Sequence, residues 1–206
     1  MDEHLARNER MWDRRAEDFD ARRFDYFRIL QRRVLSLMPL RKGITFLDVG
    51  CGTGRAVLEA HRRLEGEGSF HGIDLSPGMI ERASENAAGL TGVDFTVADA
   101  EHLPFDDASI DLIVCTNSFH HYPRPVSSLR QFSRVLTRGG AAYILDVTAD
   151  LFLIRWIDAR TRAKEPEHVR FYSTLEFKEM LGQAGLSYAG RKVVAFPEIL
   201  HIGRKP

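Results

Sequence analysis

Short apolar runs alternate with amphipathic stretches along the chain from residue 44 onward. The apolar runs predict β-strands, and the stretches with apolar positions three and four apart predict helices. The expected strands span residues 44–49, 69–74, 93–98, 110–116 and 140–147, and the expected helices span 53–65, 77–90 and 125–137. This alternation predicts a parallel sheet with helices on both faces.

Both ends of the chain add elements to this core. Helices are expected over residues 5–20, 24–38 and 174–184, and strands over 187–195 and 199–204. Ser76 followed by Pro77 matches a helix N-terminus, because serine caps the first turn and proline needs no N–H there. Ser173 and Glu176 match a capping box, and Gly185 is a helix stop signal.

Composition limits the possible classes of protein. The chain has 206 residues, 44% of them hydrophobic, which suffices for one globular domain. Its 29 basic and 29 acidic residues balance, so neither nucleic acid nor an acidic membrane is expected as a partner. No signal peptide and no apolar run near the ~20 residues of a membrane span are evident. Cys51 and Cys115 form neither a disulfide framework nor a metal-binding spacing, so we expect a cytoplasmic protein without a metal site.

The most informative segment covers residues 46–55. An apolar strand containing Asp48 leads into Gly50, Gly52 and Gly54 at alternate positions, and an amphipathic stretch follows. Glycine permits a positive φ and a close approach of the backbone to a ligand. The spacing differs from the Gly-x-Gly-x-x-Gly pattern of dinucleotide-binding proteins. The segment therefore predicts a ligand-binding turn of another kind.

Further landmarks follow this turn in order. They are Gly72–Ser76, Asp99–Phe105 with Ser109–Ile113, and Leu129, Val135–Leu136 and Gly139–Gly140. With these motifs, the region from residue 44 to about 140 resembles the class I S-adenosylmethionine-dependent methyltransferases. The resemblance is strongest to the small-molecule group related to ubiquinone and menaquinone biosynthesis methyltransferases. Arg138 stands where that family usually has proline.

The resemblance implies a Rossmann-like methyltransferase fold of the α/β class. We expect a doubly wound, mostly parallel seven-stranded sheet, with an antiparallel strand in the last pair. A single methyltransferase domain is expected over residues 1–206, with an N-terminal helical lid (1–42), a cofactor-binding core (43–148) and an acceptor-side segment with the C-terminal strands (149–206). The implied cofactor is S-adenosyl-L-methionine, with S-adenosyl-L-homocysteine as product, and the implied acceptor is a small molecule.

Acidic residues at successive strand ends are expected to share one ligand site, because ligands bind beyond the carboxyl ends of the strands in such sheets. Asp74 suits the ribose, since a carboxylate can accept hydrogen bonds from both hydroxyls. The resemblance implies cofactor contacts at Asp48, Gly50, Gly52 and Asn117 for the methionine moiety, and at Leu75, Met79, Asp99 and Ala100 for the adenine. Cys51, in the same turn, is also expected among the cofactor-binding residues. The alternatives are an ordinary tight turn, aspartates that cap strand ends, and core packing of the two apolar residues.

The loop from Asn117 to Tyr122 carries the candidate catalytic residues. His121 is the first candidate and His120 the second, because histidine titrates near neutral pH and can take a proton from an acceptor. The alternative is that these histidines pack the loop or contact the cofactor. Adjacent histidines lack the i, i+4 spacing that presents two metal ligands on one helix face.

Acceptor specificity is expected from the two ends of the chain. Residues 12–20 resemble the family's opening motif, with Phe19 where tyrosine is common. The segment 150–172 lies where this family builds its acceptor pocket. The residues there that could meet an anion are Arg155, Arg160, Arg170 and Tyr172. They could equally be surface residues, which is the interpretation that we favour.

Two other functions remain open at the level of the sequence. One is a non-catalytic subunit or regulator that binds S-adenosylmethionine or S-adenosylhomocysteine. The other is an NAD-dependent oxidoreductase, which the glycine spacing disfavours. A base methylase is also disfavoured, because Ser118 follows Asn117 in place of the Asn-Pro-Pro-Tyr signature. The sequence specifies neither the acceptor, nor whether O, N, C or S is methylated, nor whether the protein is a monomer or a homodimer.

Overall fold

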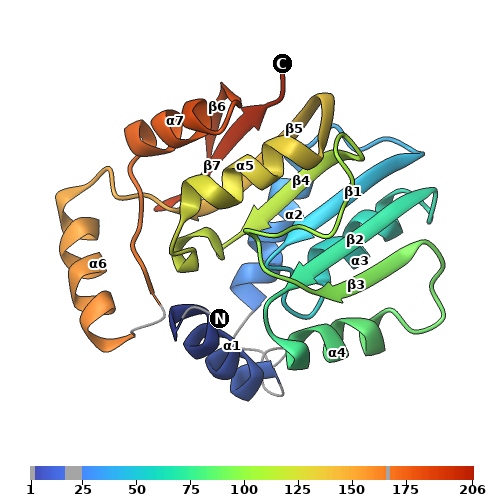
Figure 1. Cartoon of the computed structure of the whole chain (residues 1–206), viewed down its shortest axis with the longest axis horizontal. Coiled ribbons are helices and arrows are strands. Elements are labelled where there is room, and N and C mark those ends of the chain that lie inside the picture. Colours follow the sequence, from blue (N-terminus) through green and yellow to red (C-terminus); the bar gives the residue numbers. More distant parts are fainter. Residues whose placement is uncertain (1–2, 17–24, 166–167) are drawn as a thin grey trace.

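A seven-stranded sheet forms the centre of the computed structural model, which describes residues 3–16, 25–165 and 168–206. The strands are β1 (Ile44–Val49), β2 (Gly68–Asp74), β3 (Val93–Val97), β4 (Ile110–Thr116), β5 (Leu136–Val147), β6 (Ser187–Ala195) and β7 (Glu198–Arg204). Their order is β3-β2-β1-β4-β5-β7-β6 (Figure 1). Neighbouring strands are parallel except that β7 runs antiparallel to β5 and β6. The predicted doubly wound, mostly parallel sheet is confirmed.

Helices cover both faces of this sheet. They are α1 (Glu3–Ala16), α2 (Asp25–Leu37), α3 (Arg55–Arg63), α4 (Pro77–Asn86), α5 (Pro125–Val135), α6 (Phe152–Lys164) and α7 (Thr174–Gln183), with a short 3-10 helix, η2 (Phe119–His121). α5 and α7 lie on one face, and α2 and α3 on the other (Figure 1). α4 packs beside β3 at the sheet edge, and α1 packs against α4.

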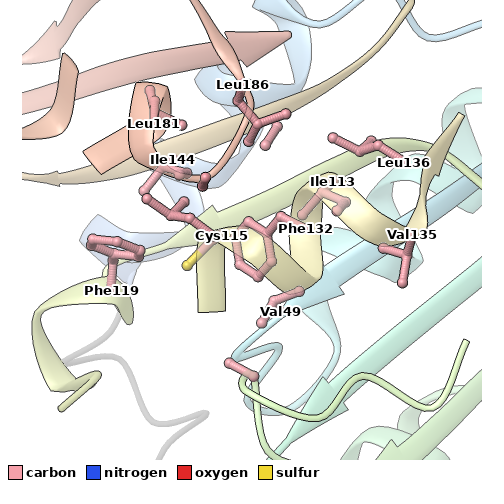
Figure 2. Close-up of a cluster of buried hydrophobic side chains, with 14 of the residues drawn as sticks. Val49, Ile113, Cys115, Phe119, Phe132, Val135, Leu136, Ile144, Leu181 and Leu186 are labelled. Atoms are coloured by element: carbon pink, nitrogen blue, oxygen red, sulfur yellow. The ribbon is translucent and has the colours of Figure 1, made fainter. Parts of the chain in front are cut away.

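Alternate side chains of the central strands fill two hydrophobic layers. Leu47, Ile113 and Cys115 belong to the layer under α5 and α7, part of which Figure 2 shows. Phe46 and Leu112 belong to the layer under α2 and α3. Strands buried on both faces need apolar residues at every position. This explains why the central strands form continuous apolar runs in the sequence.

The predicted helix ends are confirmed by their hydrogen bonds. The Ser76 hydroxyl accepts from the Met79 N–H at 3.1 Å, with proline at the first helical position. Ser173 and Glu176 form the reciprocal capping box of α7. Gly185 follows α7 with a φ of 80°, where a side chain would be unfavourable. Local capping chemistry therefore fixes where α4 and α7 begin and where α7 ends.

Other predicted boundaries shift by a few residues. α3 begins at Arg55 rather than residue 53, and α4 ends at Asn86 rather than residue 90. β5 begins at Leu136, within a segment that the sequence assigned to a helix and a turn. The helix predicted over 5–20 ends at Ala16 among the described residues, and Phe19 lies outside them.

α6 is absent from the sequence prediction. Only Ile154 and Asp158 are buried in it, while Phe152 is 84% exposed and Trp156 is 50% exposed. Phe152, Leu153, Trp156 and Ile157 do recur three and four residues apart, but the stripe is short and its side chains are exposed rather than packed on the core. α6 follows β5 and precedes α7 in the chain, and it lies at one side of the molecule (Figure 1).

Three observations complete the fold. Within residues 3–16, 25–165 and 168–206, every helix is too short or too polar to span a bilayer. Cys51 and Cys115 are both buried free thiols. In the same part of the chain, no three histidine, cysteine or acidic side chains gather in an arrangement suited to a metal ion.

Candidate active site

The turn after β1 brings the backbone close to neighbouring strand-end loops. Gly50, Gly52 and Gly54 have φ angles of 74°, 52° and 80°, in the left-handed region that disfavours a Cβ. A Cβ at Gly50 would overlap the Ser118 hydroxyl, and one at Gly54 would lie 2.5 Å from Phe95 Cζ. Backbone conformation therefore favours glycine at all three positions, and space also requires it at Gly50 and Gly54.

Two strand-end aspartates organise the loops on which they stand. Asp74 Oδ2 accepts from the Gly52 N–H at 2.9 Å, and its Oδ1 accepts from the Ser76 N–H at 3.0 Å. Burial raises the pKa of Asp74, although these backbone donors oppose the shift. Asp99 Oδ1 accepts from the Glu101 N–H at 3.0 Å. Asp74 and Asp99 thus cap their loops while also lining a common cavity.

A cavity of about 240 Å³ lies at the carboxyl ends of the central strands. Ten of the twelve predicted site residues line it, namely Gly50, Cys51, Gly52, Asp74, Leu75, Met79, Asp99, Ala100, Asn117 and His121. The other two, Asp48 and His120, are not among its lining residues. The cavity therefore gathers nearly all the residues expected to share one ligand site.

Asp48 is fully buried behind the glycine turn. Neither of its carboxylate oxygens has a hydrogen-bond partner among the described residues. Burial, together with the charge of Asp74, raises the pKa of Asp48 to about 8. Burial therefore favours the protonated form of Asp48, which lies next to the glycine turn and outside the cavity wall.

Five polar side chains of the cavity wall each keep one buried atom without a hydrogen-bond partner among the described residues. These atoms are Asn8 Oδ1, Gln31 Oε1, Glu101 Oε1, Asn117 Oδ1 and Ser128 Oγ. An unpaired buried polar group costs ~1–3 kcal/mol, and folded proteins leave few of them. Their gathering around one cavity indicates that the cavity binds a polar ligand.

α1 forms one wall of this cavity, at the place where the N-terminal lid is predicted. Asp13 Oδ1 accepts from the Ser76 hydroxyl at 2.5 Å and from the Gly78 N–H at 2.9 Å. Asn8 Nδ2 donates to the His121 carbonyl at 3.3 Å. These bonds join α1 to the first turn of α4 and to the loop after β4.

The two candidate histidines have different environments. His121 is buried and lines the cavity. His120 Nδ1 lies 2.8 Å from Asp146 Oδ1, and the His120 N–H donates to Asp146 Oδ2 at 2.9 Å. Burial lowers the pKa of His120, but the charge and hydrogen bond of Asp146 outweigh it, so the pKa is raised. The His168 ring packs against His120. Of the two candidates, His121 is thus the one that lines the cavity.

Asn117 is held in an unusual backbone conformation at the end of β4. Its φ is 52°, and its Nδ2 donates to both carboxylate oxygens of Glu198 at 2.9 and 3.0 Å. Burial and the charge of Asp146 raise the pKa of Glu198 to about 7. Glu198, at the start of β7, therefore positions a residue of the cavity wall.

Sequence reasoning missed several lining residues. Glu101 and Tyr122 lie in the loops after β3 and β4, which also hold predicted site residues. Their position after a strand could therefore have identified them as lining residues. Trp12 belongs to the opening motif but was not assigned to the site, although its ring meets the His121 ring edge-on at 5.5 Å. Gln31 lies on a predicted amphipathic helix and carried no local signal.

Comparison with known proteins identifies the family. The model of the methyltransferase domain matches residues 40–185. The chain belongs to the methyltransferase family. An aklanonic acid methyltransferase from a Streptomyces species is 32% identical over 131 residues, covering 63% of this chain and 60% of that protein. A demethylmenaquinone methyltransferase from Staphylococcus aureus is 32% identical over 125 residues, covering 61% and 52%. The chain thus spans little more than half the length of these curated relatives.

Solved structures show the same methyltransferase fold. A Haloferax volcanii protein, described as a methyltransferase and solved with a methyltransferase activator, has a TM-score of 0.83 at 24% identity, covering 95% of this chain and 97% of that one. A SAM-dependent methyltransferase from Aquifex aeolicus has a TM-score of 0.76 at 22% identity, covering 94% and 98%. For this methyltransferase, as for its family, the cofactor is S-adenosylmethionine.

Proposed function

We propose that this methyltransferase transfers the methyl group of S-adenosylmethionine to a small-molecule acceptor in the cavity beyond β1, β2 and β4. The observation that carries the proposal is the gathering of unpaired polar atoms and predicted cofactor residues around that one cavity. The relatives named for aklanonic acid and demethylmenaquinone support a small-molecule acceptor.

The residues present fit this cofactor. Asp74 would accept hydrogen bonds from the ribose hydroxyls, because its oxygens keep acceptor capacity beyond their two backbone bonds. Asp99 and the Ala100 N–H would form hydrogen bonds with the adenine edge, and Leu75 and Met79 would enclose the ring. The glycine turn would let the backbone approach the methionine moiety, because a Cβ at Gly50 would collide with the Ser118 side chain, which also lines the cavity. When bound, S-adenosylmethionine supplies a methyl group on an activated sulfonium.

The residues of the protein position the acceptor and take one proton from it. Positioning alone supplies a large part of the acceleration in a two-reactant displacement. His121 takes the proton from an acceptor that enters protonated, since it is the candidate base on the cavity wall. His120, held by Asp146, fixes the loop that carries His121. α1 limits the access of water to the site.

Incubation with methyl-tritiated S-adenosylmethionine and fractionated metabolite extracts tests the proposal. The unmodified protein is expected to label a small molecule. In His121→Ala, turnover should fall about a hundredfold or more, because general base catalysis contributes on that scale. Affinity for S-adenosylhomocysteine should stay within about threefold, since cofactor contacts lie elsewhere on the wall.

Two outcomes contradict this proposal. Tight binding of S-adenosylhomocysteine with no labelled product from any fraction would indicate a non-catalytic binding subunit. Equal turnover in His121→Ala and the unmodified protein would remove the base role, leaving positioning as the only function of that loop.

A further inference from the structure

A second cavity, of about 320 Å³, lies between α6 and the start of α7 and shares no lining residue with the cofactor cavity. Its wall is mostly polar and includes three arginines, Arg155 and Arg162 from α6 and Arg170 from the loop that follows. We propose that this cavity is an anion-binding site for a small molecule bearing a carboxylate or phosphate group, held by these three guanidinium groups.

The arginines keep donors for such a ligand. Arg155 uses its Nε to donate to the Ala149 carbonyl at 2.8 Å, and it forms no ion pair with a carboxylate of the described residues. Arg162 Nη2 lies 3.3 Å from Asp158 Oδ2, and Arg170 pairs with Glu176 through one Nη group. A guanidinium carries five N–H donors in a planar fork that fits carboxylate and phosphate oxygens. Each arginine therefore retains N–H groups for a ligand.

The two acidic side chains of the wall, Asp158 and Glu176, already accept hydrogen bonds from other groups of the chain. Asp158 Oδ1 accepts from His168 Nε2 and from the Phe171 N–H, both at 2.7 Å. Glu176 Oε2 accepts from the N–H and the hydroxyl of Ser173, both at 2.8 Å. Three guanidinium groups against two such carboxylates leave the wall with one net positive charge. An anion is the ligand that this charge favours.

Not every arginine of this region lines the second cavity. Arg160 stacks over the Trp156 ring, with its Cζ 4.3 Å from the ring centroid, and does not line the cavity. Tyr172 lies under Arg170 and is outside the wall. Arg160→Gln is therefore a matched control for Arg155→Gln, because both changes remove one charge from an exposed position of the same helix.

Calorimetric titration of the full chain tests this site. The protein is saturated with S-adenosylhomocysteine, so that an anion cannot occupy the cofactor cavity. Inorganic phosphate and acetate are titrated separately, with chloride holding the ionic strength constant. The unmodified protein should bind at least one of them saturably, at one site per chain. Arg155→Gln and Arg162→Gln should each weaken binding about tenfold or more, whereas Arg160→Gln should stay within about twofold.

The outcomes separate the ligand classes and can overturn the proposal. A response to phosphate alone assigns the occupant to phosphate-bearing molecules, and a response to acetate alone assigns it to carboxylates. Absence of saturable binding of both anions overturns the proposal. So does an equal loss in Arg155→Gln and Arg160→Gln, because the effect would then come from overall charge rather than from this cavity.

Discussion

Replacing Asp48 with asparagine should change how the stability of the ligand-free protein depends on pH. The Asp48 carboxyl is fully buried without a described partner, and its pKa rises from 3.8 to about 8 on folding. The folded state therefore holds a proton that the unfolded chain has lost between these two values. Stability must fall as pH rises through this window, by ~1.4 kcal/mol for each pH unit. The loss is complete above pH 8.

Asparagine has nearly the same shape and no such titration. From pH 5 to pH 8, the free energy of unfolding of the unmodified protein should therefore fall by up to about 4 kcal/mol relative to Asp48→Asn. Urea denaturation of both proteins at pH 5, 6.5 and 8, without ligand, measures this difference. Titrating groups that do not interact with Asp48 contribute equally in both proteins and cancel in this difference. Parallel pH profiles, with a difference constant to within about 0.5 kcal/mol, would refute the reasoning.

Three further changes test the site and the fold. Asp74→Asn should weaken S-adenosylhomocysteine binding about tenfold or more by calorimetry, because a charged acceptor is lost; Asp94→Asn, an exposed acid on β3, should have no effect. Asp13→Ala should speed hydrogen exchange in α1 about tenfold while α4 stays protected, since its bonds to α4 are removed; unchanged exchange would contradict this anchoring. Ser173→Ala should cost about 1 kcal/mol in urea denaturation through loss of the α7 cap; an unchanged midpoint would count against it.

The parts of the fold that could be predicted are those with local causes. Strands buried on both faces need uninterrupted apolar residues, and the glycine turn needs left-handed backbone angles. Ser76 and Ser173 cap helices through contacts three residues away. α6 has only a short run of apolar residues at helical spacing and no capping side chain at Leu151, so the sequence prediction assigned no helix there.

Two features of the site could not be predicted. One depends on contact between segments that are distant in the sequence, and the other on the direction in which a side chain points. Glu198 and Asn117 are 81 residues apart in the sequence, and only the sheet order brings them together. His120 and His121 have the same chemistry and adjacent positions, and the short helix after β4 alone decides that one lines the cavity and the other bonds Asp146. The order of residue types in the sequence does not specify where either histidine side chain points.

The position of α1 bears on how the protein should be handled at the bench. Leu5, Asn8 and Trp12 belong to the cavity wall, so a purification tag fused ahead of α1 would lie close to this cavity. The opposite terminus is remote, since the Lys205 N–H bonds to Gly140 near the beginning of β5 (Figure 1). Kinetic work on this methyltransferase is therefore best done with any affinity handle placed after Pro206.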